Sequence, residues 1–324
     1  MSPTIVDFDV CICAQQGYPA QERIMDFLQL QTFKAIVDEG SVLGAAEALH
    51  CVQSNVTARI RSLEHAVGVK LFHRQGRKLQ LTPSGRTLLG YADRILALSR
   101  EASAALNPAN EPAGDFSLGA IESSATSRLP AVLARFHAAY PKVRLNLVTD
   151  TSLNLLDEIQ HGRVDAALIA GTACLEAQAQ ALVVADEIYR EPIVLVAPAR
   201  AGRVQEASDL SGATLLMWPS GCPYRATMEQ WLASNAVTPG RILSYGSYAT
   251  IVACVGAGVG YSLVPRGIYQ RYRQEANIVG HAMEDLAAVP NFFVRHRGVE
   301  VHPAREAFLR VMREYVAGAP PTAA

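Results

Sequence analysis

The stretch HCVQSNVTARIRSLEHAVGVKLFHRQGRKLQLTPSG, residues 50–85, decides the fold of the N-terminal part of this chain. Between residues 50 and 86, seven basic residues stand against the single acid Glu64, a local charge of +6 in a chain of formal charge −1. Such a concentration is typical of a surface that displaces counterions from phosphate. Most charge runs are simply solvated, but this one alternates with apolar residues at helical spacing and with side chains that can read bases.

The apolar spacing predicts two short helices joined by a tight turn. Val56, Ile60, Leu63 and Val67 recur at intervals of four, three and four, which indicates one buried helix face. A preceding helix, which Ser41 can cap, has a narrow face of small residues that allows close approach. This is the pattern of a helix-turn-helix, in which the second helix enters the major groove of DNA.

The polar face of the second helix and the segment after it supply the candidate DNA contacts. Asn and Gln pair with adenine, Arg pairs with guanine, and hydroxyls serve base or phosphate. Two short strands, expected at Val69–Phe72 and Leu79–Leu81, enclose a basic wing at 73–78 whose Arg74 can enter the minor groove. Each side chain could instead only position the protein on the backbone. The predicted DNA-binding residues are Gln53, Ser54, Asn55, Thr57, Arg59, Arg61, Arg74, Arg77, Lys78 and Thr82.

A long helix follows, with Thr82 as its cap and Pro83 at its first position. Its apolar residues lie at close to heptad spacing, and a small winged domain cannot cover them all. We therefore expect a homodimer formed through residues 83–107, with a hinge after the helix at 108–113. The expected seam consists of Leu88, Ala92, Ile95, Ala102 and Leu106.

The segment SVLGAAEALHCVQSNVTARIRSLEHAVGVKLFHRQGRKLQLTPSG resembles the N-terminal domain of LysR-type transcriptional regulators, and the match is colinear over residues 25–106. The resemblance implies a homotetramer, built as a dimer of dimers, on double-stranded promoter DNA that contains an interrupted inverted repeat. It also implies a small-molecule effector that alters DNA bending. Three positions depart from the family pattern. Val52 replaces a hydroxyl residue, so the cap of the second helix is expected at Ser54, while Asn55 replaces a small residue or proline and Ala58 a basic residue.

Residues 114–317 alternate strands and helices, which predicts largely parallel sheets covered by helices. The resemblance implies two Rossmann-like subdomains, crossed by two strands near 188–196 and 283–292, as in periplasmic solute receptors. The predicted fold class is α/β: an N-terminal winged helix-turn-helix, a long linker helix and a two-subdomain effector domain of the periplasmic-binding-protein type II. The expected domains are an extension at 1–24, a DNA-binding domain at 25–82, the dimerising helix at 83–107, the hinge, an effector domain at 114–317 and a tail at 318–324.

Hydroxyl-rich loops mark the candidate effector site. Ligands of open α/β sheets bind beyond the carboxyl ends of the strands, where helix N-termini point inward, so we expect a small anionic effector. The same Ser and Thr residues could instead be plain helix caps. The predicted effector-binding residues are Ser123, Ser124, Thr126, Thr151, Ser152, Ser220, Gly221, Cys222, Ser247 and Tyr248.

The segment WPSGCPYR, residues 218–225, resembles a branch of the family associated with glutamate and polyamine metabolism. Within it, Cys222 precedes a helix, where a thiol can have a lowered pKa and react with an oxidant. The alternative is a small thiol that merely lines a pocket.

The remaining features exclude several classes of protein. Six scattered cysteines form neither a disulfide framework nor a zinc array, so we expect a cytoplasmic protein without a bound metal or cofactor. The uncharged stretch 242–265 is interrupted by glycines and serines, and it predicts strand, helix and strand in a buried core, not a membrane span. Residues 1–24 lack the pattern of a signal peptide and are expected to be disordered or to reflect a misassigned start.

Three functional hypotheses remain. The first is a ligand-responsive transcription factor, and the second is a solute-binding receptor of the same two-lobed fold that has no DNA function. The third is an enzyme on the same lobes, but the sequence groups no nucleophile with a base and holds no catalytic motif. The intact basic helix-turn-helix favours the first hypothesis.

Overall fold

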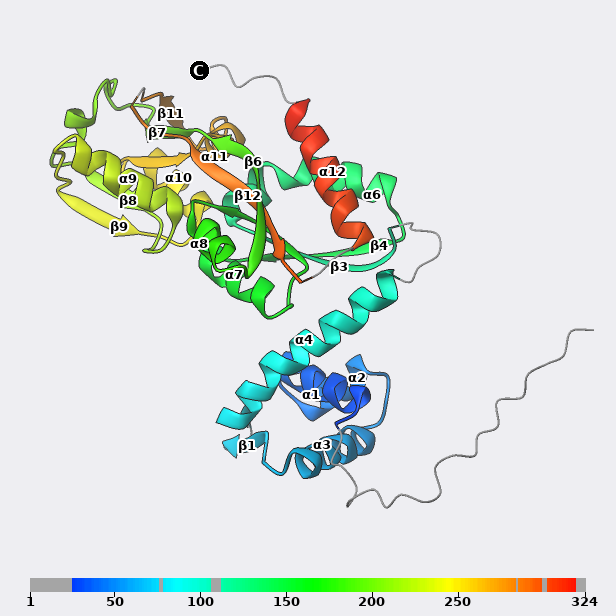
Figure 1. Ribbon diagram of the computed structural model, residues 1–324. Coiled ribbons are helices and arrows are strands. Elements are labelled where there is room, and N and C mark those ends of the chain that lie inside the picture. The colour runs from blue at the N-terminus through cyan, green and yellow to red at the C-terminus, as the bar shows by residue number, and fades with distance from the viewer. Residues whose placement is uncertain (1–24, 76–77, 106–111, 284, 299–301, 319–324) are drawn as a thin grey trace, which may run out of the picture. The chain divides into compact units, whose positions relative to one another are not determined.

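The computed structural model describes residues 25–75, 78–105, 112–283, 285–298 and 302–318 (Figure 1). The expected extension at 1–24, the wing residue Arg77 and most of the hinge and the tail lie outside them. The chain divides into two compact units, one ending at Ala92 and the other beginning at Asp93. Each unit has its own hydrophobic core.

The first unit is a winged helix-turn-helix. Its helices begin where the sequence provides caps: Asp26 accepts a hydrogen bond from the Gln29 backbone N–H at 2.7 Å, and Ser41 accepts one from Gly44 at 2.9 Å. Gly40 ends the first helix with a φ of 65°, a conformation that suits glycine. The elements are α1 (Phe27–Glu39), α2 (Val42–Ala48), α3 (Gln53–Val67), β1 (Phe72–Gln75), β2 (Lys78–Leu81) and the first part of α4 (Pro83–Ala105), which continues into the second unit after Ala92.

The core of the first unit lies between α1, α2 and α3. Phe33 and Leu63 are fully buried, and the Phe33 ring lies 5.3 Å from that of Phe72 between centroids. The hairpin of β1 and β2 is joined to α4 through Thr82, whose Oγ1 donates to the Lys70 carbonyl (2.7 Å) and accepts from the Gly85 N–H (2.9 Å). A Cβ at Gly85 would collide with the Leu71 carbonyl oxygen, so this contact requires glycine.

The second unit contains two subdomains, each built on a sheet. The first sheet has the strand order β4-β3-β5-β12-β6, in which β3 runs parallel to β4 and β5 while β12 is antiparallel to its neighbours. The second subdomain has the order β10-β7-β11, and the parallel pair β8-β9 joins it through a bridge between Leu215 and Tyr261. The strands are β3 (Gly114–Ala120), β4 (Val143–Thr149), β5 (Ala166–Ala170), β6 (Val183–Glu191), β7 (Ile193–Pro198), β8 (Thr214–Met217), β9 (Arg241–Ser244), β10 (Ser262–Pro265), β11 (Ile278–His281) and β12 (Val289–His296).

Helices cover both faces of the first sheet, with α6 and α12 on one face and α7 and α8 on the other (Figure 1). Phe308 of α12 is fully buried, with its ring centroid 5.3 Å from Phe136 and 5.7 Å from Phe116. The helices are α5 (Glu122–Ser127), α6 (Leu129–Ala139), α7 (Ser152–Gln160), α8 (Ala173–Ala179), the 3-10 helix η1 (Ala207–Leu210), α9 (Pro223–Ser234), α10 (Tyr248–Gly256), α11 (Arg266–Tyr272) and α12 (Pro303–Ala317).

The chain crosses between the subdomains twice, once from β6 to β7 and once from β11 to β12. At the first crossing, the Glu191 carboxylate accepts hydrogen bonds from Arg128 Nη2 (2.6 Å) and from the Gly267 N–H (2.7 Å). Arg128 lies between α5 and α6 in one subdomain and Gly267 lies in α11 of the other. Glu191 therefore ties the two subdomains together at their connection.

The structure confirms the predicted fold class, including the two crossings and the strand-helix-strand order within 242–265. No helix in the described part of the chain is both long and apolar enough to cross a membrane. Two local predictions were wrong. The first wing strand begins at Phe72, not at Val69, and the N-cap of α3 is Val52 without a side-chain hydrogen bond, so Ser54 lies inside the helix and does not cap it.

The predicted seam of α4 also changes. Leu88 and Ala92 are buried within the chain, and Leu106 lies outside the described residues. The exposed apolar stripe of α4 is instead formed by Tyr91 (57% exposed), Ile95 (39%) and Leu98 (64%). These residues are four and three positions apart, which places them on one side of the helix.

Candidate functional site

Helix α3 presents an apolar face to the helical core and a polar face to solvent. Val56 and Leu63 are fully buried and Ile60 is 9% exposed, which orients the helix as the spacing predicted. The polar face contains most of the side chains expected to contact DNA. Gln53, Ser54, Asn55 and Arg61 are exposed, and Thr57 and Arg59 are half-buried.

Glu64, the single acid of this basic region, forms hydrogen bonds with the segment that follows α3. Glu64 accepts hydrogen bonds from Lys70 Nζ (2.6 Å) and from the Leu71 backbone N–H (3.0 Å). The charge of Lys70 is therefore partly compensated within the protein. The arginines of α3 are the stronger candidates for contacts to DNA.

The wing residues are placed by their strands. Arg74 lies in β1 opposite Leu79, and Lys78 lies in β2 opposite Gln75. Thr82, which was also predicted to contact DNA, uses its hydroxyl as donor and acceptor in the cap of α4. The Thr82 hydroxyl therefore already makes hydrogen bonds within the protein, and a contact to phosphate would have to be made in addition to them.

A cavity of about 40 Å³ lies at the carboxyl ends of β3, β4 and β8, with residues from both subdomains around it. Five of the ten predicted effector residues line it: Ser123, Thr151, Ser152, Cys222 and Tyr248. The lining also contains six residues that were not predicted: Ile121, Glu122, Asp150, Trp218, Pro223 and Tyr224.

The other five predicted residues lie outside this lining. Ser124 is buried, and its hydroxyl lies 2.9 Å from the Tyr189 hydroxyl, which gives it a structural contact. The cavity does not include Thr126, Ser220, Gly221 or Ser247. Glu122 comes two residues after β3 and Asp150 comes directly after β4, so the strand-end rule applies to these carboxylates as well as to the hydroxyls.

The hydroxyl groups of the lining fall into two kinds. Thr151 caps α7 by accepting from the Asn154 N–H, and Ser152 Oγ bonds both the carbonyl (3.1 Å) and the N–H (3.3 Å) of Ala170. By contrast, Ser123 Oγ and Tyr248 Oη are buried without a hydrogen bond of standard geometry. Ser123 lies near the Tyr224 side chain and Tyr248 lies near the Cys222 thiol, so a ligand would compete with these contacts.

Burial changes the chemistry expected of Cys222. Desolvation raises the pKa of its thiol, and the backbone N–H groups of Tyr224 and Arg225, which lower it, offset this only in part. The sequence had suggested that the helix start could lower this pKa, and that was wrong because the side chain is largely removed from water. A neutral thiol is a poor nucleophile, which favours the pocket-lining role.

Glu122 is the half-buried carboxylate of the cavity. Its two oxygens accept from the Tyr248 backbone N–H at 3.2 and 3.4 Å, at the N-terminus of α10. Desolvation raises the pKa of Glu122, and the hydrogen bond from Tyr248 opposes that rise. The charged form is therefore less stable here than in water.

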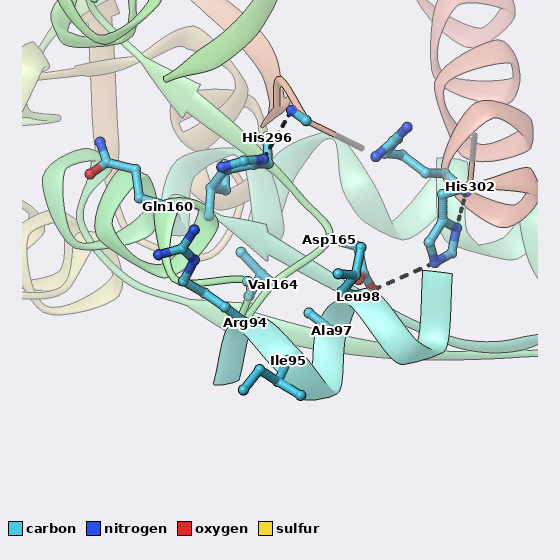
Figure 2. Close-up of a pocket in the computed structure, with 13 residues that line it drawn as sticks. Arg94, Ile95, Ala97, Leu98, Gln160, Val164, Asp165, His296 and His302 are labelled. Carbon is cyan, nitrogen blue, oxygen red and sulfur yellow. Dashed lines mark hydrogen bonds and ion pairs between the residues drawn. The ribbon is translucent and has the colours of Figure 1, made fainter. Parts of the chain in front are cut away.

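A second cavity, of about 250 Å³, lies beside the C-terminal half of α4 within the second unit. Figure 2 shows Arg94, Ile95 and Ala97 of this helix on the lower side and His296 above them, with Asp165 near Leu98 and joined by a dashed line to His302. His302 accepts from the Arg305 N–H through Nδ1 at 3.2 Å, and its Nε2 lies 3.9 Å from Asp165 Oδ2. None of the predicted site residues lines this cavity.

The described residues contain no group of three or more His, Cys, Asp or Glu side chains arranged to hold a metal ion.

The DNA-binding part and the C-terminal part of the chain each match a family of known proteins. Residues 27–86 match the bacterial regulatory helix-turn-helix proteins of the lysR family, and residues 109–317 match the LysR substrate binding domain. The HTH-type transcriptional regulator GltR of Bacillus subtilis is 34% identical over 292 residues, covering 90% of this chain and 97% of that protein. The uncharacterized regulator YusT of the same organism is 34% identical over 286 residues, covering 88% and 94%.

Solved structures share the fold. Full-length OxyR of Pseudomonas aeruginosa, in a variant form, superposes with a TM-score of 0.71 at 22% identity, covering 90% of this chain and 98% of that one. Full-length CbnR in complex with its target DNA gives a TM-score of 0.64 at 21% identity, covering 90% of this chain and all of that one.

The fold and the two sites define a DNA-binding transcriptional regulator with a separate ligand-binding domain. The chain belongs to the LysR family of transcriptional regulators.

Proposed function

We propose that this regulator binds promoter DNA through α3 and the hairpin of β1 and β2, and that a small molecule in the cavity at Glu122 and Tyr248 alters that binding. The observation that carries the proposal is the exposed polar face of α3, with Gln53, Asn55 and Arg61 beside a basic hairpin. Amide and guanidinium groups on a helix of this kind match base edges in the major groove. The protein would act in the cytoplasm, on chromosomal DNA.

The proposal predicts that Arg61→Ala weakens binding to the promoter. Loss of one guanidinium that pairs with a base costs about 1–3 kcal/mol, which corresponds to roughly 5- to 150-fold in affinity. A gel-shift titration with DNA from upstream of the coding sequence, at fixed salt, measures the effect. Arg310→Ala removes an exposed arginine from α12 and is the matched control. Equal affinity of the Arg61 variant and the unchanged protein would contradict the proposed contact.

We further propose that two chains pair through α4. Its exposed stripe of Tyr91, Ile95 and Leu98 has the spacing that two packed helices require. Two such dimers would pair further into a tetramer.

Leu98→Glu is therefore expected to prevent pairing through α4, because each such pair would have to place two carboxylates in an apolar seam. Light scattering coupled to size exclusion should then report about half the molar mass of the unsubstituted protein, because a tetramer separates into dimers or a dimer into monomers. Leu175→Glu, at a similarly exposed leucine of α8, should leave the mass unchanged. If both variants keep the original mass, α4 is not the interface.

A further inference from the structure

Among the described residues that line the effector cavity there are two carboxylates and no Lys, Arg or His. Glu122 follows β3 and Asp150 follows β4, so they stand at neighbouring strand ends of the same subdomain. Asp150 is exposed, and Glu122 is half-buried. A ligand entering the cavity would meet negative charge at both positions.

Glu122 also occupies the place where an anionic ligand would be expected to bind. The N-terminus of a helix attracts negative charge because its first N–H groups lack partners within the helix. At the start of α10, the Tyr248 N–H already donates to the Glu122 carboxylate. The protein has thus supplied its own anion at this helix end, and a ligand carboxylate would compete with it and be repelled by it.

The rest of the lining supplies hydrogen-bond acceptors and aromatic rings. Ser123 and Tyr248 are each 3% exposed, and their hydroxyl oxygens make no hydrogen bond of standard geometry, although the Tyr224 side chain lies near Ser123 and the Cys222 thiol lies near Tyr248. The Trp218 and Tyr248 rings lie 5.3 Å apart between centroids at a tilt of 53°. Two rings beside a carboxylate form a surface that attracts a cation.

The size of the cavity limits what part of a ligand it admits. About 40 Å³ is available, and a water requires roughly 10–15 Å³ by this measure, so only a small head group fits. An ammonium group is close to water in size. It donates three hydrogen bonds and accepts none, so the Glu122 carboxylate and the hydroxyls of Ser123 and Tyr248 could all accept from it.

We propose that the effector of this regulator carries a primary ammonium group, which enters the cavity between Glu122, Ser123 and Tyr248 and is flanked by Trp218. The inference depends on the proposed function, in which this cavity is the effector site. It replaces the expectation of an anion, which followed from hydroxyl-rich loops and helix N-termini. Hydroxyls donate and accept equally well and do not specify the sign of a ligand's charge, whereas the two carboxylates do.

The test uses three probes of equal chain length that differ only in head group: n-butylamine, butyrate and n-butanol. Full-length protein is titrated with each at neutral pH, and tryptophan fluorescence and Tm are followed. Trp218 lines the cavity and is one of two tryptophans in the chain, so its emission reports occupancy. We expect the amine to change the emission and to raise the Tm, and the other two probes to do neither at the same concentration.

Glu122→Gln separates a binding role from a structural one. The amide oxygen can still accept from the Tyr248 N–H, but the charge is lost, so the affinity for n-butylamine should fall roughly 10- to 100-fold. The same variant should keep or raise the Tm of the ligand-free protein, because it removes a carboxylate that burial destabilises. Glu176→Gln, at an exposed position on α8 outside the lining, should change neither quantity.

Two results would overturn the inference. The first is butyrate binding as tightly as n-butylamine or more tightly, with affinity increased by Glu122→Gln; the cavity would then remain the effector site, but for an anion. The second is no response to n-butylamine at millimolar concentration in protein that still binds DNA through Arg61. In either case the gel-shift result decides the DNA-binding part of the proposed function independently.

Discussion

Replacement of Glu191 by alanine is expected to lower the free energy of unfolding of the effector domain by about 3–5 kcal/mol, the range seen when one partner of a buried ion pair is removed. The Glu191 side chain is 3% exposed and that of Arg128 is 19% exposed, with Nη2 and Oε2 2.6 Å apart. The variant would leave the guanidinium without its carboxylate and the Gly267 N–H without its acceptor. Both losses occur at the connection between the subdomains.

The electrostatics agree with this expectation. Burial lowers the pKa of the Arg128 guanidinium, but the charge and hydrogen bonds of Glu191 raise it by more, so the pKa stands above its ordinary value. The stacking of this guanidinium over the Tyr189 ring, 5.0 Å from the centroid, would not compensate for a missing charge. Glu191 therefore stabilises the charged form of Arg128 at this position.

Denaturant unfolding followed by circular dichroism measures the effect of Glu191→Ala. Glu187→Ala, on the same strand but exposed and, among the described residues, paired with Arg190, is expected to cost less than about 1 kcal/mol. Glu191→Gln keeps an acceptor for Gly267 and should fall between the two. If Glu191→Ala and Glu187→Ala cost the same, Glu191 does not hold the subdomains together.

Local sequence patterns predicted most of the elements, because their causes lie within a few residues. The spacing of Val56, Ile60 and Leu63 orients α3 correctly, and the cap at Thr82 marks the start of α4. The uninterrupted apolar run 166–170 forms the strand β5, and all five of its residues are buried. In these cases period and capping determine the structure without long-range information.

Contacts between residues far apart in the chain could not be predicted in this way. Arg128 and Glu191 are separated by 63 positions, and no periodicity connects them. The seam of α4 shows the same limit, because Leu88 and Ile95 have similar side chains and only tertiary packing buries one and exposes the other. Burial also reversed the expected shift of the Cys222 pKa.

The effector cavity was predicted in part. The rule that ligands bind at strand ends placed Ser123, Thr151 and Tyr248 correctly around it. The expectation of an anion, however, followed from hydroxyl-rich loops and helix N-termini, and it did not include the neighbouring carboxylates Glu122 and Asp150. Charge in a lining is a stronger guide to ligand class than hydroxyls, because an unpaired charge is costly to bury.

Leu63→Ala is expected to unfold the DNA-binding unit at a markedly lower temperature while leaving the effector domain intact. Leu63 is fully buried in α3, and truncation of such a leucine costs about 2–5 kcal/mol. That is a large share of the stability of a small domain, about 5–15 kcal/mol in total. Specific binding to promoter DNA should therefore be lost near the growth temperature, although Leu63 itself faces away from the DNA-reading surface.

Scanning calorimetry of the full chain distinguishes this mechanism from the loss of a contact. The two compact units predict that one transition moves to lower temperature and the other stays in place. Leu43→Ala, at a 53% exposed leucine of α2, is the matched control and should shift neither transition by more than a degree or two. A single transition that moves as a whole in Leu63→Ala would mean that the DNA-binding unit and the effector domain unfold cooperatively. A ligand that stabilises the effector domain would then also stabilise the DNA-binding unit, and effector binding could be transmitted to DNA through stability alone.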